Sequence, residues 1–165
     1  DAPERAAGAR MRNVNIGVLL GLGSWRQDAF FLGLQAKYLQ DKFPDVEIGA
    51  AIPRLRPYGG DFKAYNNISD KNVVQIITAL RIFLPRLGIT LSTRESSSLR
   101  ENLLPLGITR MSAGSSTRVG GHTIESPEES NPGQFEISDT RSVREIKDML
   151  TEKGYQPVLK DWTRI

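Results

Sequence analysis

Three short segments place arginine, serine and glycine directly after apolar, strand-like runs. They are IPRLRP at 52–57, LSTRES at 91–96 and TRMSAGSST at 109–117. In a chain of repeated strand–helix units, the loops that follow the strand carboxyl ends converge on one face. Arginine suits a carboxylate ligand there, because its guanidinium binds bidentately and stays charged when partly desolvated. The pattern therefore predicts an anion-binding site at this face.

The first two segments supply four candidate ligand-binding side chains. Arg54 and Arg56 are separated by one residue, so an extended backbone presents them on the same face. Arg94 follows the next strand at the corresponding place, and Ser92 lies two residues earlier on the same side. We predict that these residues share one anion. The alternatives are solvated loop arginines and, for Arg94, an ion pair with Glu95 or another acid of the rim.

The third segment adds hydroxyl groups around a glycine turn. Ser112, Ser115, Ser116 and Thr117 surround Gly114 after the fourth predicted strand. Amides and hydroxyls in such a turn can bind an anion, although Gly–Ser turns are also common without a ligand. Ser112 and Ser115 are the substrate-binding candidates from this segment.

Composition excludes several classes of function. The 165 residues are 39% hydrophobic and 25% charged with a net charge of +3, which is typical of a folded domain without a nucleic-acid footprint. No apolar run reaches the roughly 20 residues of a membrane span, and the first residues lack the apolar core of a secretory signal. We therefore expect a cytoplasmic protein that binds neither membrane nor nucleic acid.

The sequence indicates neither a metal site nor a dinucleotide-binding site within these residues. The chain has no cysteine and one histidine, His122, so it offers no thiolate or His-rich metal site of its own. His122 follows two glycines in a loop without an acidic or histidine partner nearby, and we assign no catalytic residue. The stretch GLGSW at 21–25 lacks the third glycine of a dinucleotide fingerprint, so a Rossmann site is rejected.

Apolar runs alternate with helical patterns in four units. Strands are predicted at 14–20, 47–52, 88–91 and 108–111. Helices are predicted at 25–42, 69–83, 98–104 and 142–153. The first of these helices is indicated by apolar side chains at helical spacing, namely Phe30, Phe31, Leu34 and Tyr38.

Capping residues mark where three of the helices begin. Ser69 caps the second, Ser98 and Glu101 form a capping box on the third, and Ser142 and Glu145 cap the last.

Alternating strands and helices predict a parallel α/β sheet with right-handed crossovers. Four units are half of a (β/α)8 barrel or a small open sheet, with helices on the outer face. We expect residues 1–165 to form one half-barrel, with a long loop at 114–133 and a helix and tail at 140–165. Residues 1–12 resemble the end of a preceding helix, so the chain is expected to be a fragment, a split-gene product or a proteolytic piece.

Seven segments in fixed order also carry a family resemblance. They are GVLLGLGSWRQDAF, IPRLRP, ISDKNVVQIITALRIF, LSTRES, GITRMSAGSSTRVGG, GQFEISDTRS and GYQPVLKDW. Together they resemble the C-terminal half of the radical S-adenosylmethionine tyrosine lyases that make 2-iminoacetate for thiamin thiazole. The resemblance covers almost the whole chain. It implies the second half of a (β/α)8 radical S-adenosylmethionine barrel.

The resemblance also implies a reaction and its cofactors. In this family a CxxxCxxC loop of the first half binds a 4Fe–4S cluster and S-adenosylmethionine, whose cleavage starts the conversion of L-tyrosine to 2-iminoacetate and p-cresol. That loop is absent from this chain, which alone is expected to be inactive. Arg54 and Arg94 would hold the carboxylate of tyrosine or of the methionine moiety, with Ser112 and Ser115 lining the same pocket.

Two other interpretations stay open. The tyrosine lyase of FeFe-hydrogenase maturation is similar through the barrel but continues into a cysteine-bearing tail, whereas this sequence ends at KDWTRI. The chain could instead be a cluster-free module that docks thiazole synthase and its sulfur-carrier protein. The resemblance thus implies the missing N-terminal half-barrel, tyrosine, thiazole synthase and the sulfur carrier as partners. His122 stands where similar sequences often have tyrosine.

Overall fold

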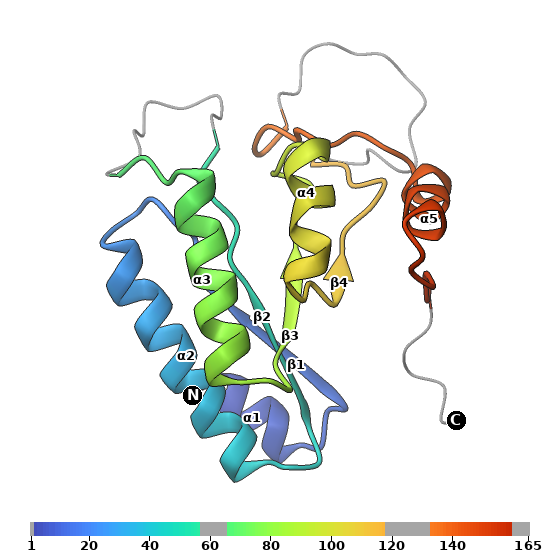
Figure 1. Cartoon of the computed structure of the whole chain (residues 1–165). Helices are drawn as coiled ribbons and strands as arrows, with labels where there is room; N and C mark the ends of the chain where they lie inside the picture. Colours follow the sequence, from blue (N-terminus) through green and yellow to red (C-terminus); the bar gives the residue numbers. More distant parts are fainter. Residues whose placement is uncertain (1, 57–65, 118–132, 160–165) are drawn as a thin grey trace.

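The computed structural model describes residues 2–56, 66–117 and 133–159 (Figure 1). The strands are β1 (Asn13–Gly17), β2 (Glu47–Ala51), β3 (Gly88–Leu91) and β4 (Arg110–Met111). The helices are α1 (Ala2–Gly8), α2 (Trp25–Lys42), α3 (Asp70–Phe83), α4 (Ser97–Leu103), η1 (Leu104–Leu106) and α5 (Val143–Glu152). His122 and most of the predicted loop at 114–133 lie outside the described residues.

The four strands form one parallel sheet in the order β1-β2-β3-β4. A helix connects each strand to the next, and α2, α3 and α4 lie over one side of the sheet (Figure 1). The predicted fold class is therefore confirmed: four successive β/α units with the helices outside, the arrangement of half a (β/α)8 barrel.

Strand β2 ends one residue earlier than predicted, and β1 and β4 are each shorter by two residues, for identifiable reasons. The strand predicted at 14–20 ends at Gly17, and pairing resumes as a single bridge between Leu20 and Arg54. Pro53 interrupts this ladder because it has no N–H to donate, although its carbonyl still accepts from the Leu20 amide at 2.9 Å. Near β4, the hydroxyl of Thr109 accepts the Ile89 amide at 2.8 Å in place of a backbone carbonyl.

The predicted helix starts are confirmed for α3 and α5 but not for α4. Capping boxes begin α3 at Ser69 and α5 at Ser142. The predicted box of Ser98 and Glu101 is wrong, because Ser96 is the N-cap and accepts a hydrogen bond from the Leu99 amide at 3.3 Å. Ser98 instead lies within the first turn, exposed to solvent.

The aromatic pattern that predicts α2 is not the face that this helix packs. The helix spans Trp25–Lys42, as predicted. Its buried residues are Leu32, Gly33, Ala36 and Leu39, whereas Phe30 and Phe31 are 62% and 63% exposed. An outer surface of large apolar side chains on α2 follows from this orientation.

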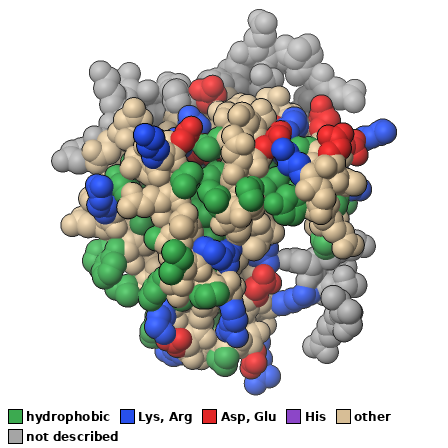
Figure 2. Space-filling view, viewed as in Figure 1, with side chains coloured by type: hydrophobic (Ala, Val, Ile, Leu, Met, Phe, Trp, Pro, Cys, Tyr) green, Lys and Arg blue, Asp and Glu red, His purple; other side chains and the backbone are tan. Residues whose placement is uncertain are grey.

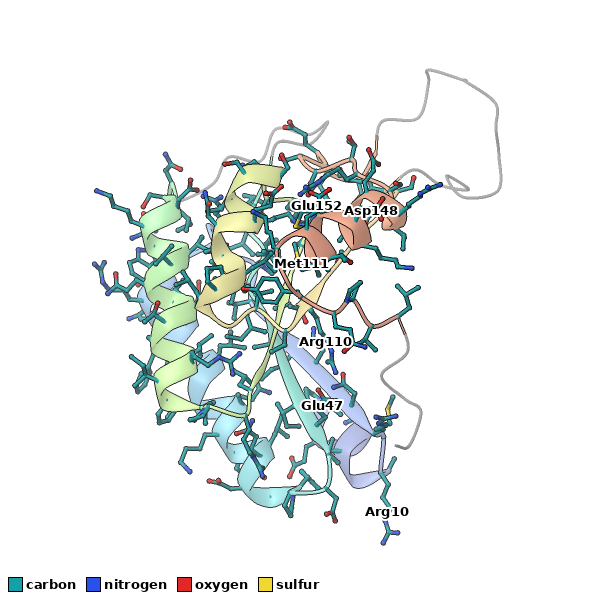
Figure 3. The ribbon with its side chains drawn as sticks, turned by 45° about the vertical axis from the view of Figure 1, so that its right-hand side comes forward. Arg10, Glu47, Arg110, Met111, Asp148 and Glu152 are labelled. Carbon is teal, nitrogen blue, oxygen red and sulfur yellow. The ribbon has the colours of Figure 1, made fainter. Side chains whose placement is uncertain are left out.

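The two faces of the sheet differ in character. Val14, Ile48 and Ile89 point into a core shared with α2 and α3. The other face is polar, with Arg110 of β4 donating to Glu47 of β2 at 2.7 Å (Figure 3).

The space for this contact comes from glycine on the central strands. A Cβ at Gly49 would lie 2.5 Å from Oδ1 of Asn15 and 3.5 Å from Nη1 of Arg110. Small residues on the polar face thus make room for long polar side chains from the outer strands.

Candidate functional site

Arg54 and Glu95 form the buried centre of the predicted site. The bridge to Leu20 fixes Arg54 just beyond β2, and its Nε lies 3.0 Å from both carboxylate oxygens of Glu95, with a further bond from Nη2. The same guanidinium donates to the Ile68 carbonyl at 2.8 Å and pairs with Asp70 at 2.8 Å. Arg54 therefore already has carboxylate partners from its own chain.

The hydrogen bond to Glu95 is the main reason that the pKa of Arg54 is raised. Desolvation acts in the opposite direction and is outweighed. A buried carboxylate needs such partners, and only 2% of the Glu95 side chain is exposed.

Hydrogen bonds of Arg56 and Arg94 connect the loop after β2 to the loop after β3, and the sequence predicts that these loops lie side by side. Arg56 donates to the Arg94 carbonyl at 2.7 Å and to Glu95 at 3.0 Å. Arg94 in turn reaches the Arg54 carbonyl at 3.4 Å. The three arginines thus lie together at the carboxyl ends of adjacent strands. Glu95 pairs with Arg54 and Arg56, so the alternative of a pair between Arg94 and Glu95 is not the one observed.

Arg94 differs from the other two arginines in its surroundings. Among the described residues, no carboxylate lies within ion-pair distance of it, and the ring centroid of Phe135 lies 3.5 Å from its guanidinium carbon. Desolvation and then the neighbouring Arg56 lower the pKa of Arg94. Arginine side chains nevertheless stay protonated in proteins at neutral pH. A half-buried cation without a carboxylate is the group best suited to an incoming anion.

The three candidate serines differ in their contacts. The hydroxyl of Ser92 accepts the Arg94 amide at 3.2 Å, so it shapes the turn that presents Arg94. Ser112 lies at the end of β4, where its amide donates to the Leu91 carbonyl at 3.0 Å. Ser115 is exposed, and the described part of the chain shows no hydrogen bond of its side chain. The structure brings Ser92 and Ser112 to the same edge of the sheet, but gives Ser115 no contact with the arginines.

A second buried ion pair, which the sequence analysis did not single out, supports this edge. Arg100 of α4 is fully buried and donates both to Asp139 and to the Ser112 carbonyl. Arg141 completes the cluster by binding Asp139 and, at 2.7 Å, Glu101. In the sequence, the only sign of this cluster is the pair of charged residues in SDTRS at 138–142. Such a pair looks the same in a buried ion pair and in a solvated loop.

This cluster anchors the segment that carries Phe135. The amides of Ser138 and Asp139 both donate to the Thr93 carbonyl, at 3.0 and 3.1 Å. Burial alone would raise the pKa of Asp139, but hydrogen bonds from Arg141 and then Arg100 outweigh it and lower the pKa to about 2. Asp139 thus stays ionised and holds the loop after β3 against the segment at 133–141.

The donor set fits a carboxylate and does not fit a metal cluster. The chain has no cysteine, and the described residues contain no group of three or more His, Asp or Glu side chains placed to hold a metal ion. The arginines and serines at the strand ends can hold the carboxylate of an amino acid or of a methionine moiety. Iron ligands would have to come from outside these residues. No helix in the described ranges has the length and hydropathy to cross a membrane.

Known proteins with similar sequences include two 2-iminoacetate synthases. The sequence is 34% identical to 2-iminoacetate synthase of Escherichia coli over 163 residues, which is 98% of this chain and 42% of the relative. It is 33% identical to 2-iminoacetate synthase of Salmonella typhimurium over the same shares. The chain thus spans less than half the length of these relatives.

Two solved structures share the fold. The FeFe-hydrogenase maturase HydG from Carboxydothermus hydrogenoformans superposes with a TM-score of 0.77 at 37% identity, over 92% of this chain and 34% of that one. Another HydG structure gives a TM-score of 0.81 at 34% identity, over 96% and 34% of the two chains. Residues 51–156 match the Biotin and Thiamin Synthesis associated domain, and the chain therefore belongs to this family.

Proposed function

We propose that this chain is the substrate-binding half of a radical S-adenosylmethionine lyase that cleaves L-tyrosine to 2-iminoacetate and p-cresol for thiazole formation in thiamin biosynthesis. The observation that carries the proposal is Arg94, a half-buried guanidinium without a carboxylate partner among the described residues. Similarity to 2-iminoacetate synthases over 98% of the chain supports the choice of reaction.

In this proposal Arg94 binds the carboxylate of the amino acid. Arg54 and Arg56 act indirectly, because both are paired with Glu95 and the three side chains fix the loops on which Arg94 stands. Ser92 orders the turn before Arg94. In this proposal Ser112, whose amide donates to the Leu91 carbonyl at the end of β4, lines the same pocket. Holding the carboxylate fixes the orientation of the substrate, which is a large part of catalysis when two groups must meet.

A 4Fe–4S cluster with S-adenosylmethionine would supply the radical that takes a hydrogen from tyrosine. The remainder of the protein would bind this cluster, since this chain has no cysteine. The residues described here would bind and orient tyrosine, or the methionine carboxylate of the cofactor, and keep water from the reacting groups. Thiazole synthase and its sulfur carrier would receive the product, in the cytoplasm.

The experiment is reconstitution of the complete barrel. This chain is combined with a chain that carries the CxxxCxxC half, or the intact natural protein is used, and the cluster is loaded under anaerobic conditions and reduced with dithionite, which supplies the electron for cleavage of S-adenosylmethionine. We expect p-cresol to form only when tyrosine and S-adenosylmethionine are both present. A folded, cluster-loaded complex that forms no p-cresol would contradict the proposal and favour a docking module for thiazole synthase.

A second candidate is the tyrosine lyase of FeFe-hydrogenase maturation. The 37% identity to the Carboxydothermus hydrogenoformans maturase favours it about as strongly as the 34% identity to the Escherichia coli synthase favours the first. The natural protein's sequence after Ile165 separates the two. A cysteine-bearing segment that binds a second cluster would identify the maturase.

A further inference from the structure

Arg100 of α4 is a buried charged side chain at the junction of three segments. It is 0% exposed, and it donates from Nη1 to a carboxylate oxygen of Asp139 and from Nη2 to the Ser112 carbonyl. Asp139 lies in the segment 133–141, and Ser112 directly follows β4. A buried ion pair often stabilises a fold no better than apolar side chains of similar size would. The pair of Arg100 and Asp139 therefore calls for a role besides stability.

The segment 133–141 is fastened to the loops that follow two adjacent strands. The amide of Asp139 donates to the Thr93 carbonyl after β3 at 3.1 Å. The carbonyl of Arg141 accepts from the Gly114 amide after β4, also at 3.1 Å. Both loops belong to the edge of the sheet where the predicted site lies, so a shift of this segment would be felt at the site.

This segment contacts both Arg94 and the residue before it. The ring centroid of Phe135 lies 3.5 Å from the Arg94 guanidinium carbon. Four residues later in the chain, Asp139 forms its hydrogen bond to Thr93, which directly precedes Arg94. The place of the ring over the guanidinium therefore depends on where Asp139 is held.

Arg141 also binds Asp139, but in a way that does not replace Arg100. Its Nε lies 2.9 Å from Oδ1 of Asp139, two residues earlier in the same segment, so this contact is local. Its bond to Glu101 of α4 joins side chains that are 21% and 28% exposed. Figure 2 shows acidic and basic side chains together on the surface around α4 and α5. Such solvent-accessible pairs contribute little, whereas the contact of Arg100 with Asp139 is shielded from water.

We propose that Arg100 and Asp139 are positioning residues, whose buried pair holds Phe135 over Arg94 and so keeps the Arg94 guanidinium ready to bind a carboxylate. This inference rests on the proposed function, in which that carboxylate belongs to tyrosine. Arg100 acts at a distance from the substrate, through Asp139 and then Phe135. Without the pair, the ring no longer restrains Arg94, which must then lose more conformational freedom when the substrate binds.

The variant for the tests replaces both charges together, as Arg100→Met with Asp139→Leu. Removal of a complete buried pair in favour of apolar side chains of similar size is often neutral for stability, whereas removal of one partner is not. Circular dichroism checks that the variant is folded. If it is not, Asp139→Asn, which keeps the shape of the side chain, takes its place with the same expected results.

The first test does not depend on the reaction. The Nε–Hε signal of Arg94 is recorded by NMR in the intact natural protein without its cluster, labelled with ¹⁵N-arginine, and is assigned by its disappearance in Arg94→Lys. A ring stacked on the guanidinium shifts this signal, and Phe135→Leu gives its position without the ring. We expect R100M/D139L to move the signal to that position. A signal that stays at its original position would overturn the proposal.

The second test measures p-cresol formation by the reconstituted, cluster-loaded protein. We expect R100M/D139L to raise the KM for tyrosine about fivefold with kcat nearly unchanged, as for loss of the ring itself. Adding Phe135→Leu to this variant should raise KM no further, because residues that act through one another are not additive. The control is Lys37→Gln with Asp41→Asn, an exposed ion pair near the end of α2 that precedes β2, and it leaves KM unchanged.

The outcomes separate this inference from the proposed function. An unchanged KM, or a combined variant whose KM rises about 25-fold as the product of two independent effects, would refute the positioning role while tyrosine cleavage stands. An unaltered protein that forms no p-cresol would refute the proposed function, and the NMR signal of Arg94 would still decide whether Arg100 and Asp139 hold the ring in place.

Discussion

The ring of Phe135 covers one face of the Arg94 guanidinium, with 3.5 Å between the ring centroid and the guanidinium carbon. Phe135 is in turn held in place because its carbonyl accepts the Thr117 hydroxyl at 3.2 Å. The stacking fixes the plane of the guanidinium and leaves its N–H edge to bind an anion. An arginine fixed in this way loses less conformational freedom when it binds a carboxylate.

Removal of the Phe135 ring should therefore weaken substrate binding more than catalysis. We expect Phe135→Leu to raise the KM for tyrosine about fivefold, which corresponds to about 1 kcal/mol for a cation–π contact, with kcat nearly unchanged. Steady-state p-cresol formation measures both constants. Phe135→Tyr keeps the ring and is the matched control. Equal kinetics for the Leu and Tyr variants would show that the stacking has no role in binding.

Loss of the Glu95 carboxylate should destabilise the fold. Glu95→Gln leaves the largely buried guanidinium of Arg54 with the exposed Asp70 as its one carboxylate, and we expect a loss of about 3 kcal/mol in the free energy of unfolding. Urea denaturation followed by circular dichroism measures this loss. The exposed Glu152→Gln is the control, with an expected change within about 0.5 kcal/mol. A Glu95→Gln variant as stable as this control would mean that the buried pair is dispensable.

The lowered pKa of Asp139 should make the folded protein less stable in acid. Its pKa in the folded protein, about 2, lies below the ordinary value of 3.8, so the folded state binds its proton less readily than the unfolded state. The stabilisation of roughly 2 kcal/mol is complete above about pH 5 and is lost as the pH falls from about 5 toward 2. Urea titrations at several pH values should show this decline, and a shallower one for Asp139→Asn. Identical pH slopes for both proteins would contradict the assignment.

The observed start of α4 can be tested with two neighbouring serines. Ser96→Ala removes the hydroxyl that caps the Leu99 amide and is expected to cost about 1 kcal/mol. Ser98→Ala lies in the first turn without a capping bond, so its expected effect is within about 0.5 kcal/mol. Thermal unfolding of both variants gives the comparison. A larger loss for Ser98→Ala would support the capping box predicted from sequence.

The sequence predicted most strands and helices of this protein, because residues close together in the chain determine where these elements form. The apolar runs at β2 and β3 and the Ser69 and Ser142 caps act within a few residues, and all lie where predicted. Placing Arg54 and Arg94 side by side also followed from topology, since carboxyl ends of adjacent parallel strands meet at one edge.

The pairing of charges could not be predicted in the same way. Arg54 and Glu95 are 41 residues apart, and Arg100 and Asp139 are 39 apart, so only the folded arrangement decides which acid meets which base. The exposure of Phe30 was also missed, because helical spacing shows that apolar residues share a face of α2 but not which face packs on the sheet. The substrate contacts of Arg94 and Ser112 remain predictions.

The most direct test of the central claim is to replace Arg94 with alanine in the reconstituted, cluster-loaded enzyme. Loss of a charge-assisted contact worth about 2–3 kcal/mol should lower kcat/KM for tyrosine roughly 30- to 150-fold. Iron and sulfide content should stay at the level of the unaltered protein, because the cluster ligands lie elsewhere. Unchanged tyrosine turnover, or an equal loss of activity and cluster, would contradict a carboxylate-binding role for Arg94.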